Sequence, residues 1–152
     1  MKDLEKLRSI ASYQFGENVG EILFPEGVTI VRSKSTGKIK HVYLNGELIA
    51  TLRPRDGLLS LTIEGARRLL QAKKGFLVVV KSEAAEAISK GRSVFAKHVI
   101  QADEEIRPGD EVLVIDERNN LLAVGRALLF GEEMTKFKRG VAVRVRRGVK
   151  EG

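Results

Sequence analysis

The stretch GRSVFAKHVIQADEEIRPGDEVLVID, residues 91–116, decides how the second half of the chain folds. Its segment VFAKHV (94–99) has the β-branched and apolar residues typical of a strand. The segment IQADEEI (100–106) carries acidic residues where the dipole of a short helix favours them. Pro-Gly at 108–109 then predicts a turn, and EVLVID (111–116) is again typical of a strand. The pattern predicts a strand, a short acidic helix, a turn and a second strand.

More short strands follow toward the C-terminus. Asn119-Asn120 predicts a hairpin that leads into the long strand LLAVGRALLF (121–130), where Gly125 indicates a bulge or a close backbone contact. GEEMTKF (131–137) predicts a second short helix, and GVAVRVRRGV (140–149) predicts the last strand. Short strands with two minor helices in so compact a segment are typical of a partly closed β-barrel.

The first half of the chain changes from a helical period to a strand period. Residues 3–14 place Leu4, Leu7, Ile10 and Ala11 on one helical face, with Asp3 at the start and Gly16 after the end. Thr62 is the expected cap of a helix over 63–72. Strands are predicted at 28–33, 39–44, 47–52 and, as a fully buried strand, 76–80, with Asn45-Gly46 as a type I′ hairpin turn.

These elements predict an α+β protein of two domains. We expect a small N-terminal α+β domain over residues 1–81 and a connecting helix over 82–91, which Ser82 caps and Gly91 ends. The barrel, a mixed β-barrel with two short helices, would then occupy residues 92–152.

Composition narrows the classes of function. The chain has 152 residues, 43% of them hydrophobic and none of them cysteine, which excludes disulfides and thiolate zinc sites. Neither a long apolar run nor a signal-peptide pattern is present, so we expect a cytoplasmic protein with no membrane partner. The charged fraction of 31% without cysteine is typical of a thermophile protein.

Positive charge indicates an anionic partner. The formal net charge is +7, and Lys136–Lys150 contains seven Lys or Arg residues without an acidic one. Nucleic acid is the commonest partner of such a chain, although many stable cytosolic proteins are simply basic.

The segments VFAKHV, RPGDEVLVID, LLAVGRALL, GEEMTKF and GVAVRVR together resemble a PUA domain, from Arg92 to Val149. The PUA domain is an RNA-binding β-barrel named after pseudouridine synthases and archaeosine transglycosylases. The version in this chain resembles most the C-terminal one of archaeal tRNA-guanine transglycosylases. NGELIATLRPRDGLLSLTIEGARRLL (45–70) resembles the small domain that precedes PUA in those enzymes.

The resemblance implies binding of RNA, with tRNA as the expected partner, and no catalysis. The family's active site belongs to a separate (β/α)₈ barrel with aspartates and a cysteine-rich zinc site, and such barrels need at least about 200 residues. We therefore expect no catalytic residue, no metal and no cofactor in these 152 residues. The Asp103-Glu104-Glu105 cluster is best explained as a structural feature, since acidic residues are common in a first helical turn.

In the family, RNA lies along the first helix and the strands beside it, in a shallow groove. Arg107 stands at the Pro-Gly turn, where Gly109 lets the backbone approach a ribose-phosphate closely. In the last strand, period-2 geometry buries Val141, Val143 and Val145 and turns the intervening arginines to solvent, where their guanidinium forks suit phosphate. The expected RNA-binding residues are Lys97, His98, Arg107, Gly109, Arg126, Arg144, Arg146 and Arg147.

Alternatives remain open at this point. Arg144 and Arg146 could be an ordinary solvated strand face, and His98, where related PUA domains often have glycine, could pack under a loop. The chain could be a tRNA-binding accessory subunit of an archaeosine-type modification enzyme, working with a catalytic subunit. It could also be a protein-interaction adaptor in translation or ribosome assembly, which docks through its N-terminal helix and hairpin sheet.

Overall fold

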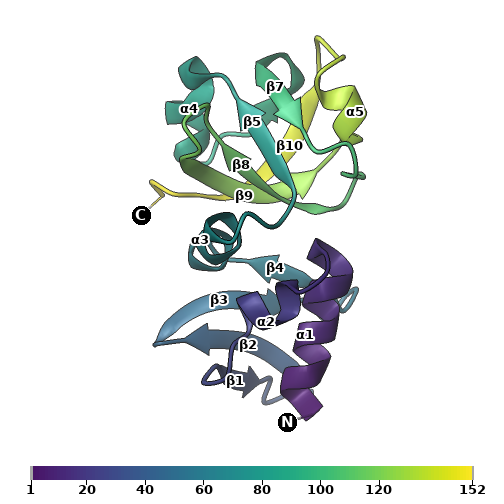
Figure 1. Cartoon of the computed structure of the whole chain (residues 1–152), viewed down its shortest axis with the longest axis vertical. Helices are drawn as coiled ribbons and strands as arrows, with labels where there is room; N and C mark the ends of the chain where they lie inside the picture. Colours follow the sequence, from purple (N-terminus) through teal and green to yellow (C-terminus); the bar gives the residue numbers. More distant parts are fainter. Residues whose placement is uncertain (1, 152) are drawn as a thin grey trace. The chain divides into compact units, whose positions relative to one another are not determined.

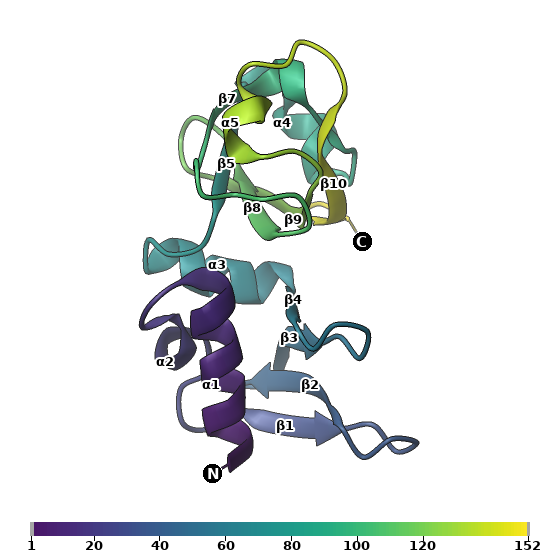
Figure 2. The same ribbon diagram turned by 90° about the vertical axis from the view of Figure 1, so that its right-hand side faces the viewer.

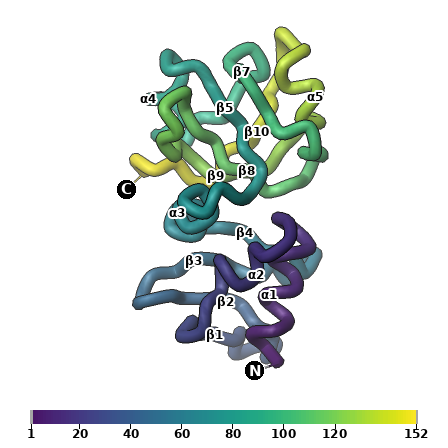
Figure 3. Tube along the Cα trace, in the orientation of Figure 1, coloured from purple at the N-terminus to yellow at the C-terminus, as the bar shows by residue number. Residues whose placement is uncertain are grey.

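The computed structural model describes residues 2–151 of the protein. They form two compact units, which divide between Lys74 and Gly75. The chain trace runs from the last helix of the first unit directly into the first strand of the second (Figure 3).

The first unit is a four-stranded antiparallel sheet with helices against it (Figure 1). The strand order within residues 2–74 is β1-β2-β3-β4. Its elements in chain order are α1 Lys2–Phe15, α2 Val19–Leu23, β1 Thr29–Arg32, β2 Ile39–Leu44, β3 Glu47–Leu52, β4 Leu59–Leu61 and α3 Ile63–Gln71.

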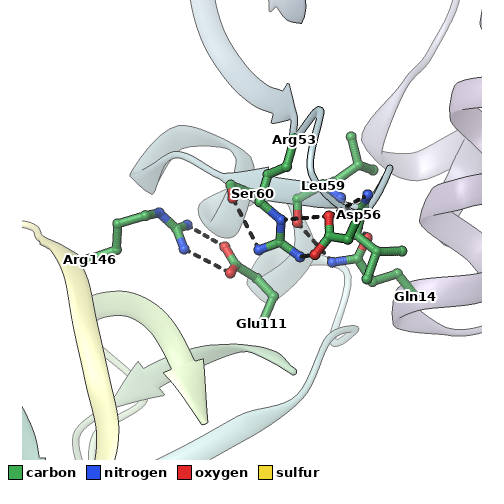
Figure 4. Close-up of polar contacts among 8 residues, drawn as sticks. Gln14, Arg53, Asp56, Leu59, Ser60, Glu111 and Arg146 are labelled. Atoms are coloured by element: carbon green, nitrogen blue, oxygen red, sulfur yellow. Dashed lines mark hydrogen bonds and ion pairs between the residues drawn. The ribbon is translucent and has the colours of Figure 1, made fainter. Parts of the chain in front are cut away.

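Helix α1 confirms the amphipathic pattern. Leu4, Leu7 and Ala11 are buried, and Gly16, with a φ of 116°, ends the helix. Asp3 is not the cap, because the helix already includes it. Gln14 fixes the helix to the sheet, since its side-chain amide donates to the carbonyl of Leu59 at 2.8 Å and accepts from the same residue's N–H at 2.8 Å (Figure 4).

The predicted turn and cap of the first unit are confirmed. Asn45 and Gly46 have φ values of 51° and 82°, as a type I′ hairpin requires. The Thr62 hydroxyl accepts the N–H of Gly65 at 3.1 Å at the start of α3. Local sequence decides these features, so they could be read from the chain alone.

An ion pair holds the loop between β3 and β4. Arg53 donates from Nε to Oδ1 of Asp56 at 3.1 Å and from Nη1 to the Ser60 hydroxyl at 3.3 Å (Figure 4). Slight burial raises the pKa of Asp56, but hydrogen bonds from the Leu58 N–H and the Arg53 guanidinium outweigh it and hold that pKa below the ordinary value. The loop therefore keeps its charge pair at neutral pH.

The second unit is a six-stranded sheet within residues 75–151 that curls into a nearly closed barrel (Figures 1 and 2). The strand order is β6-β10-β9-β8-β5-β7, and only the β5–β8 pair is parallel among the described strands. The elements are β5 Leu77–Val80, α4 Ser82–Ser89, β6 Val94–Phe95, the 3₁₀ turn η1 Ala96–His98, β7 Val99–Ala102, β8 Glu111–Ile115, β9 Leu121–Ala127, α5 Gly131–Met134 and β10 Val141–Gly148.

The boundary at residue 81 is wrong, because β5 belongs to the second unit. This strand pairs with β8 through Leu77 and Leu113 and with β7 through Val79 and Gln101. A continuous apolar run predicts a strand buried on both faces but does not reveal which sheet receives it. Because β5 follows the first unit directly in the sequence, sequence order assigns it to the first sheet. Its pairing with β7 and β8 shows that it belongs to the second sheet.

Helix α4 is part of the barrel, and the predicted connecting role of 82–91 is wrong. Ala84 and Ile88 are buried in the core of the second unit. Ser82 does not cap the helix, since its N–H and its hydroxyl both donate to the Glu117 carboxylate at 3.1 Å. Gly91 follows the helix end with a φ of 103°, as expected.

The predicted strand over 94–99 and the predicted acidic helix over 100–106 are also wrong. The strand stops after Phe95, η1 follows, and β7 occupies part of the expected helix. Asp103 lies in a turn instead. Its carboxylate accepts the Leu77 N–H at 2.9 Å, and its own N–H donates to the Leu77 carbonyl at 3.1 Å. Residues 99–102 pair with β5 instead of forming a helix, and the local sequence gives no sign of this pairing. The pairing outweighs the preference of acidic residues for a helix N-terminus.

None of the helices within residues 2–151 has the length and apolar character needed to cross a membrane.

The Asp116 carboxylate stabilises the β8–β9 hairpin through hydrogen bonds. Its carboxylate accepts the N–H groups of Arg118 and Asn120 at 2.9 Å and the Asn120 side-chain amide at 3.0 Å. We expect Asp116→Ala to lower the free energy of unfolding by about 1–2 kcal/mol, measured by urea denaturation at pH 7. Arg118→Ala, on the same turn, should change it by less than about 0.5 kcal/mol.

The Asp116 effect should depend on pH. Partial burial raises the pKa of Asp116, but the hydrogen bonds from Asn120 and Arg118 outweigh it, so the pKa lies below its ordinary value of 3.8. A carboxylate with a depressed folded-state pKa stabilises fully above its unfolded pKa and loses that effect as the pH falls through the folded value. The difference between wild type and Asp116→Ala should therefore persist down to about pH 4 and shrink below it. A difference that is constant from pH 7 to pH 2 would contradict this account.

Candidate nucleic-acid interface

The Pro-Gly turn is tied to the end of β9. The Asp110 N–H donates to the Arg107 carbonyl at 3.0 Å, and Gly109 has a φ of 96°, which together are typical of a type II turn. Gly109 also donates to the Ala127 carbonyl at 2.8 Å, and Ala127 donates back to the carbonyl of Asp110 at 2.9 Å. The turn is therefore fixed beside Arg126.

Arg126 and Arg144 lie directly opposite each other on β9 and β10. Directly paired residues of an antiparallel ladder point to the same face, and like charges in that arrangement are destabilising. Both arginines are exposed, and neither forms an ion pair with a residue of the described range 2–151. The two side chains concentrate positive charge, and a bound anion would reduce the repulsion between them.

Arg146 is held by a buried carboxylate. Glu111 on β8 is 2% exposed, and the guanidinium of Arg146 grips it with two nitrogens, one of which, Nη1, lies 2.8 Å from Oε1 (Figure 4). Arg146 therefore does not point freely into solvent as the strand period predicts. Glu111 therefore orients a basic residue of β10.

A bulge in β10 explains why Arg146 departs from the strand period. Val145 pairs with Gly125 and Arg147 pairs with Val124, so Arg146 is the extra residue on β10. A Cβ on Gly125 would lie 2.3 Å from the Arg144 carbonyl oxygen and 2.9 Å from the Val145 Cα. Both readings of this glycine apply, because it permits a close backbone contact at a bulge of the facing strand.

The remaining residues of β10 follow the predicted pattern only in part. Ala142 is fully buried together with Val143, although period 2 places them on opposite faces. Arg147 is exposed beyond the bulge. In a tightly curled barrel, one face of a strand meets the core and the other can be covered by neighbouring segments, which a single period does not capture.

Lys97 and His98 lie elsewhere, on η1. This turn is fixed beside the start of β10 by the Ala96 N–H, which donates to the Gly140 carbonyl at 2.9 Å. The His98 ring packs edge-on against Phe95, with ring centroids 6.3 Å apart, and its backbone carbonyl accepts the N–H of Lys81. Exposed Phe95 was missed by the sequence reasoning, because it falls in a segment interpreted as a strand.

A second surface of the unit is acidic. A cavity of about 810 Å³ has Leu77, Val79 and Ile115 on its lining and carboxylates around it. The acidic lining residues are Asp103, Glu104, Glu105 and Glu132, with Lys136 as the basic one. Within residues 2–151, no group of three or more His, Cys, Asp or Glu residues is arranged to hold a metal ion. A polyanion would avoid this cavity and meet the arginines instead.

Comparison with known proteins agrees with this geometry. Residues 77–149 match the family model of the PUA domain. The chain carries a PUA domain. Residues 5–75 match the model of the patch-forming domain C2 of tRNA-guanine transglycosylase, so the PUA domain follows a C2 domain. Both matches support the division between Lys74 and Gly75 over the boundary at residue 81.

Curated relatives are archaeal enzymes. The chain is 47% identical over 148 residues to the tRNA-guanine(15) transglycosylase of Methanothermobacter thermautotrophicus, which covers 96% of this chain and 23% of the relative. It is 48% identical over 146 residues to that of Pyrococcus abyssi, with 95% and 24% covered. The chain thus spans about a quarter of the length of the curated relatives it matches. The resemblance to the C-terminal C2 and PUA region of these enzymes is confirmed.

Solved structures share the fold over nearly the whole chain. A hypothetical protein from Pyrococcus horikoshii has a TM-score of 0.79 and 26% identity, covering 99% of this chain and 92% of that one. A conserved PUA domain protein from Thermoplasma acidophilum has a TM-score of 0.71 and 21% identity, covering 99% and 90%. The second likeness shows the fold alone.

The Glu111–Arg146 pair can be tested by a double-mutant cycle. Arg146→Gln leaves the buried Glu111 carboxylate without its counterion, and Glu111→Gln removes the ion pair of a half-exposed Arg146. Each should therefore destabilise the protein, with a coupling energy of about 1–3 kcal/mol. Chemical denaturation of the two single variants and the double variant gives this value. Arg144→Gln is the matched control, and its stability should lie within about 0.5 kcal/mol of wild type. Strictly additive effects would show that the pair is not coupled.

Proposed function

We propose that the protein binds RNA without catalysing a reaction, and that the PUA domain binds tRNA through the face that carries Arg126 and Arg144. The observation that carries the proposal is the direct opposition of these two arginines on neighbouring strands. Such a pair costs stability unless an anion lies near it, and a phosphodiester supplies that anion.

The turn at 107–110 completes the proposed surface. Its Gly109 has open space where a Cβ would stand, so backbone can approach a ribose-phosphate there. Arg107 sits in the same turn, and Arg147 extends the positive charge along β10. Arg146 contributes through its ion pair with Glu111, which links β10 to β8 across the intervening strand β9. Lys97 and His98 form a separate contact on η1, beside the start of β10.

The chemistry of the surface favours a structured RNA over a stacked single strand. Aromatic residues make up 5% of the sequence, whereas Lys and Arg number 27. Double-stranded RNA is recognised mostly through its shape, its phosphates and its 2′-hydroxyls, while single strands need aromatic platforms. The relatives are named for a modification of tRNA, which makes tRNA the RNA to test first.

The extent of the match favours a role beside a catalytic part. The 152 residues correspond to about a quarter of the transglycosylase relatives, and they lack the cysteines of the zinc site that the family resemblance implies. We infer that these residues provide a grip on tRNA for a modification reaction whose catalytic groups they do not contain. Co-purification of a tRNA-guanine transglycosylase barrel from native extract would show that a catalytic partner exists. If tRNA bridges the two proteins, Arg126→Gln/Arg144→Gln should abolish the co-purification. If they associate directly, the double variant should still retain the partner.

The central test is a salt titration of tRNA binding. Each phosphate contact contributes about 0.7–0.9 to the slope of log affinity against log salt, so Arg126→Gln/Arg144→Gln should lower that slope by about 1.5 and weaken binding about tenfold. Filter binding between 50 and 300 mM salt, about the range over which such slopes are measured, gives both values.

A matched control separates the surface from net charge. Arg118→Gln/Lys136→Gln removes the same charge from the PUA domain, at the β8–β9 hairpin and at the acidic cavity. This double variant should bind tRNA within about twofold of wild type. Equal losses in both double variants would refute the assignment of the arginine face, and absence of tRNA binding by wild-type protein at low salt would refute the function.

A further inference from the structure

The C2 domain contains a cleft of its own. Its volume is about 590 Å³, and its lining comes from α1, from the loop between β1 and β2, and from the end of β3 with the loop that follows. The two hairpin loops project from the same side of the domain (Figure 2). Segments that are distant in the sequence therefore meet around one hollow.

The cleft is strongly cationic. Among the described residues that line it, Asp3 is the single carboxylate, and the basic residues are Lys6, Arg32, Lys38, Lys40 and Arg53. Asp3 is already engaged, because it pairs with Arg32. Arg53 is likewise held by Asp56.

Three ammonium groups remain uncompensated. The side chains of Lys6, Lys38 and Lys40 form no ion pair or hydrogen bond with another residue of the range 2–151. Lys6 comes from the first turns of α1, and the two others lie at the end of the β1–β2 loop and the start of β2. Three free cations around one hollow attract an anion with more than one charge.

The two loops are built alike and are held in shape before any ligand arrives. In the first, Ser33 donates to the Lys38 carbonyl and Gly37 donates back to Ser33, both at 2.8 Å. In the second, Arg53 donates to the Leu58 carbonyl at 2.8 Å and Gly57 donates to Arg53 at 2.9 Å. Gly37 and Gly57 share a φ of 72°. A loop that is already ordered loses less conformational entropy when it binds.

The lining of the cleft suits a nucleotide better than an isolated ion. Ile10, Ile39 and Leu52 supply apolar surface, and Ile39 and Leu52 are themselves buried. Hydroxyl groups of Ser33, Ser35 and Thr36 stand on the cationic loop. A nucleotide in this cleft would have ammonium groups near for its phosphate, serine and threonine hydroxyls for its ribose, and apolar side chains for the faces of sugar and base.

We propose that this cleft of the C2 domain binds a sugar-phosphate segment of RNA and forms a second RNA contact, separate from the arginine face of the PUA domain. It shares with the proposed function the assumption that the partner is RNA, but it depends on different residues. Its net positive charge excludes a basic partner, and its mixture of lysines, hydroxyls and apolar surface distinguishes it from a plain polyanion track.

The test compares two double variants of the full chain. Lys38→Gln/Lys40→Gln removes two cleft cations, whereas Lys2→Gln/Lys34→Gln removes two exposed lysines of the same domain that do not line the cleft. The cleft variant should lower the salt slope of tRNA binding by about 1.5 and weaken binding about tenfold, and the control should stay within about twofold. Because the side chains of Lys38 and Lys40 form no ion pair with another residue of the range 2–151, and Lys2 and Lys34 are exposed, both variants should melt at the wild-type temperature.

A footprint gives a direct readout. Acetylation of surface lysines, followed by mass spectrometry, should show protection of Lys6, Lys38 and Lys40 by tRNA and none of Lys2 and Lys34. Heparin of equal charge should protect the cleft lysines less than tRNA does. Equal protection by heparin, or equal behaviour of the two double variants, would overturn the proposal.

The outcomes also separate this site from the PUA surface. Loss of binding in Arg126→Gln/Arg144→Gln with a wild-type response in Lys38→Gln/Lys40→Gln would overturn the cleft and leave the PUA assignment standing. The reverse result would support the cleft and overturn the PUA assignment.

Discussion

The close approach of β10 to β9 at Gly125 shapes the surface on which the RNA-binding proposal rests. Only a hydrogen can occupy the position that a Cβ would take, 2.3 Å from the Arg144 carbonyl. The facing strand bulges there, so that Arg146 leaves the regular alternation and reaches the carboxylate of Glu111. The regular part of the ladder then places Arg144 opposite Arg126. The close contact at Gly125 therefore accounts for the different roles of these arginines: Arg146 forms an ion pair within the barrel, whereas Arg126 and Arg144 face solvent.

Acidic and basic side chains are concentrated at different places on the surface. The net charge of +7 conceals a cavity rich in carboxylates at the turn after β7, an uncompensated arginine pair on β9 and β10, and a lysine-rich cleft in the C2 domain. Carboxylates also serve as structural acceptors: the exposed Asp103 accepts the N–H of Leu77, and the half-buried Asp116 accepts N–H groups of its own turn. Arg126 and Arg144 on the PUA domain form no ion pair within residues 2–151, and neither do Lys6, Lys38 and Lys40 in the cleft, so these side chains remain available to a polyanion.

Sequence reasoning succeeded where local chemistry decides the structure. The Asn45-Gly46 hairpin, the Thr62 cap and the end of α1 at Gly16 each depend on a few adjacent residues, and each is confirmed. It failed where distant segments decide. The run 76–80 has no local feature that assigns it to the second sheet, and the acidic run after Ala102 is a turn because β5 lies beside it. For the proposed RNA surface, the strand period gave the outward direction of Arg144, but it could not foresee the bulge that turns Arg146 toward Glu111.

The place of β5 limits how the two domains can be exchanged in evolution. This strand follows the C2 domain directly in the chain, yet it lies between β7 and β8 inside the PUA sheet. A recombination breakpoint within 77–80 would split an interior strand and leave the backbone groups of both neighbours without partners. A recombination event that adds or removes the intact barrel must therefore have its breakpoint in the few codons between Gln71 and Leu77, where it interrupts neither sheet.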